Sequence, residues 1–353
     1  MLTTIEAITA PIYAASLGLL AMMSAISAPI YAADFTYKVV ATQRLEGDVK
    51  WDYLTFDGER HRLFLTRGDH VDVYDLAKKS VVGTILHTNG VHGVALAPKL
   101  DRGFTSNGKD NTVTVFELSS LKVLGTVASD KKPDAIIYDA ASGHVFVANG
   151  DGKNLTVFDA KSLKVISTLD VGGKPEFMTV DNKGKLFVNV EDTNQMLVID
   201  TKLIKIKQKI ELASVCDEPT GIDIDLASNT LFAGCHNQKM AIVDAKTGKI
   251  IGSPDIGKGS DATVYDAVRK LAFSSNGDGT LTVIGKNAHN VFEPKQTVKT
   301  MVTARTMALD PVTHTIYLVA AEMEAADSAA DKDTTQRAKL KQGSLTLITV
   351  SSN

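Results

Sequence analysis

The stretch NLTVFDAKSLKVISTLDVGGKP, from Asn154 to Pro175, closely follows an earlier one, NTVTVFELSSLKVLGTVASDKKP, from Asn111 to Pro133. Both contain a short apolar run, a polar turn, a second apolar run and a break rich in Gly, Asp or Lys. Apolar runs of this length between such turns are typical of β-strands. Their recurrence about forty residues apart indicates that one structural unit is repeated along the chain.

The repeat extends in both directions from these two copies. A turn position after the first apolar run of each unit recurs at intervals of about 40 to 44 residues. These turn positions are Asp57, Ala97, Asp139, Asp181, Asp225, Asp266 and Asp310. Each unit carries four apolar runs, and no long helical pattern interrupts them. We expect the recurrent Asp side chains to accept backbone N–H groups in turns, which is a structural role.

A sheet of four short strands cannot bury both of its faces alone, whereas sheets arranged radially each pack against two neighbours. We therefore predict an all-β fold: a WD40-like, seven-bladed β-propeller of four-stranded antiparallel blades. A β-solenoid ranks far behind. The last unit has no fourth run after Gly343–Val350, and Phe35–Leu45 is left over before the first unit. We expect this N-terminal strand to close the ring in the last blade.

Composition limits the classes of partner. The chain has 353 residues, of which 44% are hydrophobic and 22% charged, so it is long and apolar enough for a large core. Its formal net charge is −3, and no continuous basic stripe indicates nucleic-acid binding. We expect residues 34–353 to form a single propeller domain, and we expect a monomer.

The first 33 residues differ from the rest, because no charged residue occurs between Ala7 and Ala33. An apolar centre followed by small residues is typical of a secretory signal, and an uncleaved membrane anchor is the alternative. A periplasmic or secreted location is therefore expected. In an oxidising compartment the only two cysteines, Cys216 and Cys235, would form a disulfide, while a pair of small buried residues is the other interpretation.

The second and third runs of several units resemble the YVTN-repeat family of β-propellers, the YncE-like proteins. The second-run motifs are FVAN (Phe146–Asn149), FTSN (Phe104–Asn107) and FSSN (Phe273–Asn276), and runs such as NTVTVFE and NLTVFD follow them. The other four units lack the Asn and read FLTR, FVNV, FAGC and YLVA. The resemblance covers nearly the whole chain after residue 34. It implies an exported seven-bladed propeller and specifies no reaction.

A functional site needs asymmetry among the repeats, and one register position provides it. Five residues before each turn position, near one mouth of the central channel, the units carry Asp52, His92, Asp134, Glu176, Thr220, Asp261 and Arg305. This set is predicted either to line a hydrated channel mouth or to bind a ligand. Asp52, Asp134, Glu176 and Asp261 are the candidate ligands for Ca²⁺ or Mg²⁺, because both cations prefer oxygen ligands. Arg305 is expected to orient an anionic group.

The sequence is compatible with two classes of function. In the first, the propeller is a non-catalytic binding or scaffolding module for a protein, a glycan or a small ligand at the channel-mouth loops. In the second, it is a lactonase-like or metal-dependent hydrolase that uses His92, Glu176 and Arg305. A long insertion in the last unit, residues 320–344, is either a lid over the channel mouth or a solvated loop.

Overall fold

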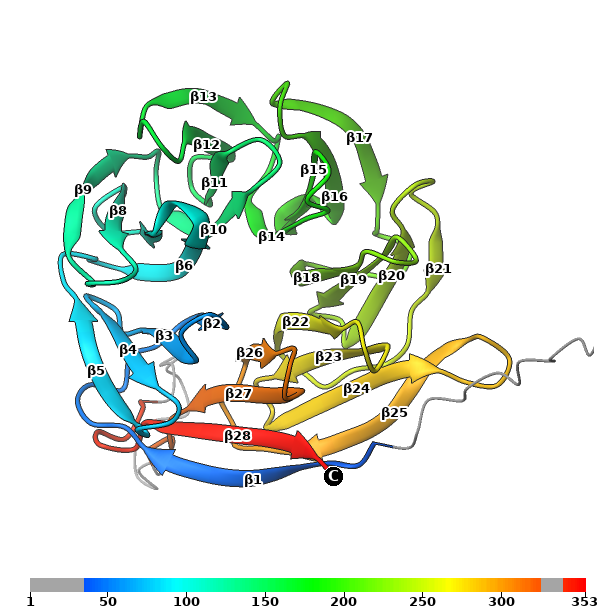
Figure 1. Ribbon diagram of the computed structural model, residues 1–353. Coiled ribbons are helices and arrows are strands. Elements are labelled where there is room, and N and C mark those ends of the chain that lie inside the picture. The colour runs from blue at the N-terminus through cyan, green and yellow to red at the C-terminus, as the bar shows by residue number, and fades with distance from the viewer. Residues whose placement is uncertain (1–34, 325–338) are drawn as a thin grey trace, which may run out of the picture. The chain divides into compact units, whose positions relative to one another are not determined.

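The computed structural model describes residues 35–324 and 339–353, and these form a ring of seven sheets (Figure 1). Each sheet has four antiparallel strands; in blades one to six the first strand faces the central axis and the fourth lies on the outside. The predicted seven-bladed β-propeller is confirmed. Two 3₁₀ turns, η1 (Pro98–Leu100) and η2 (Glu191–Thr193), are the helical segments of the described chain, and no helix in these ranges is long and apolar enough to cross a membrane.

The blades follow one another along the chain. Blade one consists of β2 (Leu54–Asp57), β3 (Arg62–Thr66), β4 (Val71–Asp75) and β5 (Ser80–Ile85). Blade two consists of β6 (Val91–Ala97), β7 (Arg102–Asn107), β8 (Thr112–Glu117) and β9 (Val123–Ala128). Blade three consists of β10 (Pro133–Asp139), β11 (His144–Asn149), β12 (Asn154–Asp159) and β13 (Val165–Asp170). Blade four consists of β14 (Pro175–Val180), β15 (Lys185–Val190), β16 (Gln195–Asp200) and β17 (Lys205–Glu211).

The remaining three blades repeat this order, with one exception at the end. Blade five consists of β18 (Pro219–Asp225), β19 (Thr230–Cys235), β20 (Lys239–Asp244) and β21 (Ile250–Gly252). Blade six consists of β22 (Ser260–Asp266), β23 (Leu271–Asn276), β24 (Thr280–Lys286) and β25 (Phe292–Lys299). Blade seven consists of β26 (Thr306–Asp310), β27 (Thr315–Ala320), β28 (Thr346–Ser352) and the N-terminal β1 (Tyr37–Arg44).

The ring is closed as the sequence predicts. β1 pairs antiparallel with β28 from Tyr37–Ser352 to Arg44–Thr346, so the start of the described chain supplies the outer strand of blade seven (Figure 1). The buried Tyr37 also fixes β1 to blade six. Its backbone exchanges two hydrogen bonds with the Gln296 side chain, and its hydroxyl accepts a hydrogen bond from Arg269. Closure therefore rests on side-chain contacts as well as on the ladder.

The Asn of the FxxN motifs has a structural role in this fold. Asn107, Asn149 and Asn276 are fully buried at the ends of second strands. Each donates two hydrogen bonds to side chains of the third strand, for example from Asn107 Nδ2 to the hydroxyls of Thr112 and Thr114. A buried amide is stable only when its polar atoms are paired, so the Asn requires the Thr or Asn residues of the following run. The motif therefore specifies a blade.

The recurrent turn carboxylates also act structurally, as predicted. Asp139 accepts the backbone N–H groups of Ala141 and Ser142, and Asp310 accepts those of Val312 and Thr313. The core lies between the blades, where six second strands each contribute a Phe that is at most 1% exposed. These residues are Phe64, Phe104, Phe146, Phe187, Phe232 and Phe273. Burying a ring of this size stabilises the fold by about 2–3 kcal/mol.

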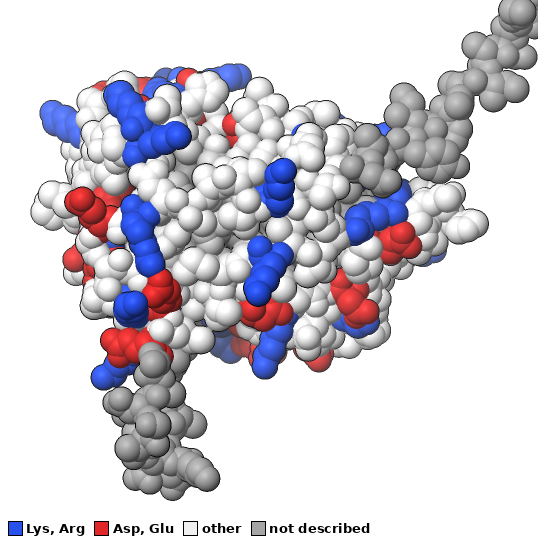
Figure 2. Space-filling view, turned by 90° about the horizontal axis from the view of Figure 1, so that it is seen from below, with Lys and Arg blue, Asp and Glu red and all other residues white. Residues whose placement is uncertain are grey.

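Residues 1–33, for which the sequence predicts a secretory signal or an anchor, lie outside the described residues, as does most of the blade-seven insertion. The described base of that insertion connects β27 to β28 as a short antiparallel ribbon. In it the Glu324 N–H donates to the Lys339 carbonyl at 2.7 Å, and the Lys341 N–H donates to the Glu322 carbonyl at 2.8 Å. On the side of the propeller shown in Figure 2, basic and acidic side chains are interspersed, and no continuous basic band runs across that face.

Candidate functional site: a charged ring at the channel mouth

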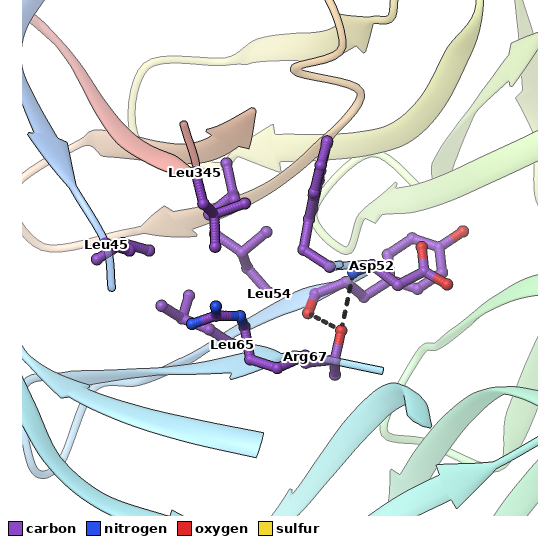
Figure 3. Close-up of a pocket in the computed structure, with 10 residues that line it drawn as sticks. Leu45, Asp52, Leu54, Leu65, Arg67 and Leu345 are labelled. Carbon is purple, nitrogen blue, oxygen red and sulfur yellow. Dashed lines mark hydrogen bonds between the residues drawn. The ribbon is translucent and has the colours of Figure 1, made fainter. Parts of the chain in front are cut away.

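The candidate positions lie at the inner ends of the blades, where the backbone departs from regular pairing. In blades two to six the register between the first and second strands shifts at this position, for example between Pro133 and Ile136. A β-bulge of this kind redirects the side chain that it carries. In blade one, Asp52 lies two residues before the start of β2, and its N–H donates to the Thr66 hydroxyl at 3.0 Å (Figure 3).

Hydrogen bonds between blades hold these positions in place. Thr306 of blade seven donates to the Asp52 carbonyl at 2.7 Å, and Ser275 of blade six donates to the Arg305 carbonyl at 2.5 Å. The Ser106 hydroxyl of blade two donates in the same way to the Asp134 carbonyl. Each carbonyl is therefore bound by the neighbouring blade, and this fixes the spacing of the side chains around the axis.

The structure brings six of the seven candidate residues together. They are Asp52, His92, Asp134, Glu176, Asp261 and Arg305, and we call them the charged ring. Their side chains are between 12% and 40% exposed, so solvent reaches all six. Thr220 does not join them, because it is only 2% exposed and its hydroxyl bonds to the Gly234 and Ser260 carbonyls.

Part of the charged ring is a continuous chain of ion pairs. Arg305 Nε donates to Asp261 at 2.5 Å, and Arg305 Nη2 donates to Asp52 at 3.3 Å. The other oxygen of Asp52 lies 2.6 Å from His92 Nδ1. Arg305, which we expected to orient an anionic ligand, is therefore already bound by two carboxylates. Burial tends to lower the pKa of Arg305, but the charges of Asp261 and Asp52 outweigh this and raise it.

Asp134 and Glu176 are the two carboxylates of the charged ring that accept no hydrogen bond from a described residue. The Asp134 side chain is 12% exposed, and no described residue donates a hydrogen bond to its carboxylate; the nearest basic nitrogen, His92 Nδ1, lies 3.6 Å away. Glu176 Oε2 is buried without a hydrogen-bond partner, although Lys174 Nζ lies 3.5 Å away. Burial raises the pKa of Asp134, and burial together with the charge of Asp134 raises the pKa of Glu176 to about 8.

His92 and Lys174 are the basic groups beside these carboxylates. Burial tends to lower the pKa of His92, but its hydrogen bond to Asp52 and the charge of Asp134 raise it above the ordinary value. Lys174 makes a close ion pair with Glu191, which draws its ammonium group away from Glu176. Ligand atoms of Asp52, His92 and Asp134 lie within 4.8 Å of one another, a spacing that one metal ion can bridge.

Two aromatic residues that the sequence analysis missed, Tyr53 and Phe177, directly follow residues of the charged ring. The rings of Tyr53 and Phe177, from blades one and four, meet with centroids 4.7 Å apart, and the Tyr53 hydroxyl lies 3.3 Å from Asp261. A signal for them exists one residue after each ring position. There the other five units carry small residues, Gly93, Ala135, Gly221, Ala262 and Thr306. The two aromatic exceptions therefore pack against each other, and Tyr53 contacts the charged ring through Asp261.

The two cysteines are joined in the structure. Cys216, in the loop before β18, and Cys235, at the end of β19, form a disulfide with their Cα atoms 5.4 Å apart. The disulfide connects the segments that carry Glu218 and His236, whose side chains pair at 2.6 Å.

Comparison with known proteins supports the fold, but it supports no family and no function. No known family's sequence profile matches the chain, and no curated protein matches it by sequence. Among solved structures, a chain of the hydrazine synthase of Kuenenia stuttgartiensis superposes with a TM-score of 0.68 at 12% identity, covering 77% of this chain and 93% of that one. A chain of a mitotic checkpoint complex gives a TM-score of 0.71 at 13% identity, covering 87% and 96%. Both similarities are to a WD40-like, seven-bladed β-propeller fold.

Proposed function

We propose that this protein is an exported, non-catalytic binding module that holds a divalent cation, Ca²⁺ or Mg²⁺, at the charged ring. The observation that carries the proposal is the pair Asp134 and Glu176, two largely buried carboxylates without hydrogen-bond donors. Two such groups resist ionisation together, and a divalent cation relieves both the repulsion and the lack of partners. The exposed edges of the charged ring leave room for water or a polar ligand to complete the coordination.

The remaining charges of the ring are already balanced, which supports a binding role. Asp261 and Asp52 share Arg305, and Asp52 also pairs with His92, so these side chains form a fixed frame around the open carboxylates. Of the four expected cation ligands, Asp134 and Glu176 are the two whose carboxylates accept no hydrogen bond from the described residues. Preorganised carboxylates of this kind bind without the cost of ordering mobile side chains.

The test is calorimetric titration with CaCl₂ and MgCl₂ of metal-free protein and of the variant Asp134→Asn/Glu176→Gln. We expect saturable binding by the wild type and none by the double variant, whose melting temperature should be unchanged or higher because the repulsion is removed. A matched control is Glu59→Gln/Glu211→Gln, which changes two exposed carboxylates and should bind like the wild type. Absence of saturable binding to the wild type, or normal binding by the double variant, would contradict the proposal.

A second candidate function, hydrolysis of a lactone or a related ester, is favoured by the Asp52–His92 contact. A carboxylate bound to one imidazole nitrogen orients the ring and strengthens the other nitrogen as a base. Turnover in a lactone screen that disappears in His92→Asn would establish the hydrolase and displace the non-catalytic function. Inactivity of protein that binds the cation would leave the binding module alone.

Membership of the YVTN-repeat family and export to the periplasm or the medium are part of the same proposal. They are supported by the FxxN motifs and by the uncharged segment from Ala7 to Ala33. N-terminal sequencing of protein recovered from the periplasm and the culture medium tests export, since a cleaved chain should begin near residue 34.

A further inference from the structure

A cavity of about 450 Å³ adjoins the charged ring on the side of blades one and seven. One wall is the segment between β1 and β2, residues 48–51, and the other is the base of the blade-seven insertion. Its lining residues are Asp48, Val49, Lys50, Trp51, Arg305, Glu324, Lys339, Leu340 and Gln342. The volume lies within the usual range of about 300–1,000 Å³ for small-molecule sites.

A buried arginine holds the first wall. Arg67 stands at the end of β3, where three other blades carry the buried Asn of the FxxN motif, and it is 2% exposed. Its guanidinium donates to the backbone carbonyls of Glu46 at 2.9 Å, Asp48 at 2.5 Å and Lys50 at 3.3 Å. In Figure 3 the side chain runs from the end of β3 toward Leu45. Asp72 neutralises its charge at 2.6 Å.

This departure from the repeat has a consequence for binding. In three blades the Asn donates its hydrogen bonds to the third strand, whereas Arg67 fixes three carbonyls of a loop that has no regular pairing of its own. A charged group is buried in this way only when its hydrogen bonds are satisfied, as they are here. The wall that carries Asp48, Lys50 and Trp51 is thereby preorganised, which lowers the entropy cost of binding a ligand.

The lining combines one aromatic residue with polar groups of both signs. Trp51 is the only tryptophan of the chain, is half-buried, and lies with its ring centroid 5.9 Å from the Arg305 guanidinium. Because Asp52 and Asp261 balance Arg305, the charges left are those of Lys50, Lys339, Asp48 and Glu324. These two positive and two negative groups cancel, so the lining other than Arg305 carries no net charge. Together with Gln342 they offer hydrogen-bond donors and acceptors.

We propose that this pocket binds a neutral carbohydrate of monosaccharide or disaccharide size. Hydroxyl groups both donate and accept hydrogen bonds, which matches the mixed lining, and the apolar face of a sugar ring packs well against an indole. A charge-balanced lining gives no preference for an anionic or cationic ligand. The inference goes beyond the cation site, since it rests on different residues apart from Arg305.

The test uses the emission of the single tryptophan. Titration of the full chain with glucose, maltose, cellobiose and diacetylchitobiose should give a saturable change in Trp51 fluorescence for at least one sugar, and glycerol should give none. Calorimetry should show affinity for that sugar weakened by about tenfold or more in Trp51→Phe. Because Lys339 and Gln342 are exposed, Lys339→Ala/Gln342→Ala should fold normally and still bind more weakly.

The same titration in EDTA and in Asp134→Asn/Glu176→Gln separates this proposal from the cation site. We expect sugar binding to persist in both conditions. The carbohydrate proposal would be overturned if none of the four sugars gave a saturable response. It would also be overturned if, in the same titration with glucuronic acid and glucosamine, only these charged sugars bound. Loss of sugar binding in EDTA would mean that the sugar binds through the cation. That result would contradict the proposed carbohydrate pocket but not the proposed cation site.

Discussion

Burial and the nearby charge of Asp134 raise the pKa of Glu176 from 4.5 to about 8, so this carboxyl group is protonated in the folded protein near neutral pH. In the unfolded chain it is ionised at the same pH. Folding therefore takes up a proton between these two pKa values. The stabilisation that results is complete below about pH 4.5 and is lost as the pH rises through about 8.

Replacing Glu176 by Gln should remove this dependence. The wild-type free energy of unfolding, measured by urea denaturation in EDTA, should fall by roughly 4 kcal/mol between about pH 5 and pH 9 because of this group, at about 1.4 kcal/mol per unit of pKa difference. Glu176→Gln should have a flatter profile and exceed the wild type at pH 9. Glu59→Gln, at an exposed site, should keep the wild-type slope. A parallel profile for Glu176→Gln would refute this environment for the carboxyl group.

At the residue scale, the register of the repeats predicts which side chains lie close together but not which of them form ion pairs. Six of the seven candidate positions meet in the charged ring, because equivalent positions of a radial repeat face one axis. Thr220 fails because its short hydroxyl is satisfied by backbone carbonyls of its own and the next blade. Which carboxylates remain open also depends on side-chain reach: Arg305 can bridge Asp52 and Asp261, and no repeat pattern encodes that.

At the scale of the element, β1 is the strand on which closure of the ring depends. It covers the outer edge of β28, and Tyr37 packs edge-to-face on Phe273 of blade six with ring centroids 5.0 Å apart. An exposed strand edge is a template for pairing with other chains. Without β1, the edge of β28 and an apolar gap beside Phe273 would both be exposed.

Deletion of residues 1–45 should therefore destabilise the propeller and promote aggregation. Deletion of residues 1–34, which keeps β1, is the matched control and should melt as one cooperative transition. Calorimetry and light scattering of the two proteins measure the difference, for which we expect a lower and broader transition after removal of β1. If both deletions melt alike, the closing strand is dispensable and the interpretation of its contacts is wrong.

At the scale of the element, too, only part of the structure can be predicted from the sequence. The strand pattern and turn spacing are sufficient to predict all seven blades and the closing strand, because period-two runs and turn residues are local signals. The sequence FLTR shows that blade one lacks the FxxN asparagine, but it does not predict which groups the Arg in its place binds. Arg67 bonds to a loop 17 to 21 residues earlier in the chain, and only the three-dimensional position of that loop reveals the wall it supports.

At the scale of the whole molecule, the hydrophobic core that stabilises the propeller lies between neighbouring blades. The one covalent cross-link lies in blade five. Its outer strand, β21, has only three residues and is the shortest strand within residues 35–324 and 339–353. The Cys216–Cys235 disulfide closes a loop with a sequence separation of 19 and joins the channel-mouth loop of this blade to its second strand. A cross-link at the blade with the least outer pairing should limit local opening there.

The double variant Cys216→Ala/Cys235→Ala should accordingly lose about 3 kcal/mol of unfolding free energy, the contribution expected from the unfolded-state entropy of a loop of this length. Urea denaturation of wild type and variant measures the loss, and reductant should bring the wild type down to the variant while leaving the variant unchanged. Intact mass after alkylation should show no modified thiol in protein recovered from the periplasm and two after reduction, since such disulfides persist in oxidising compartments. Two reactive thiols before reduction would contradict both the cross-link and the proposed export.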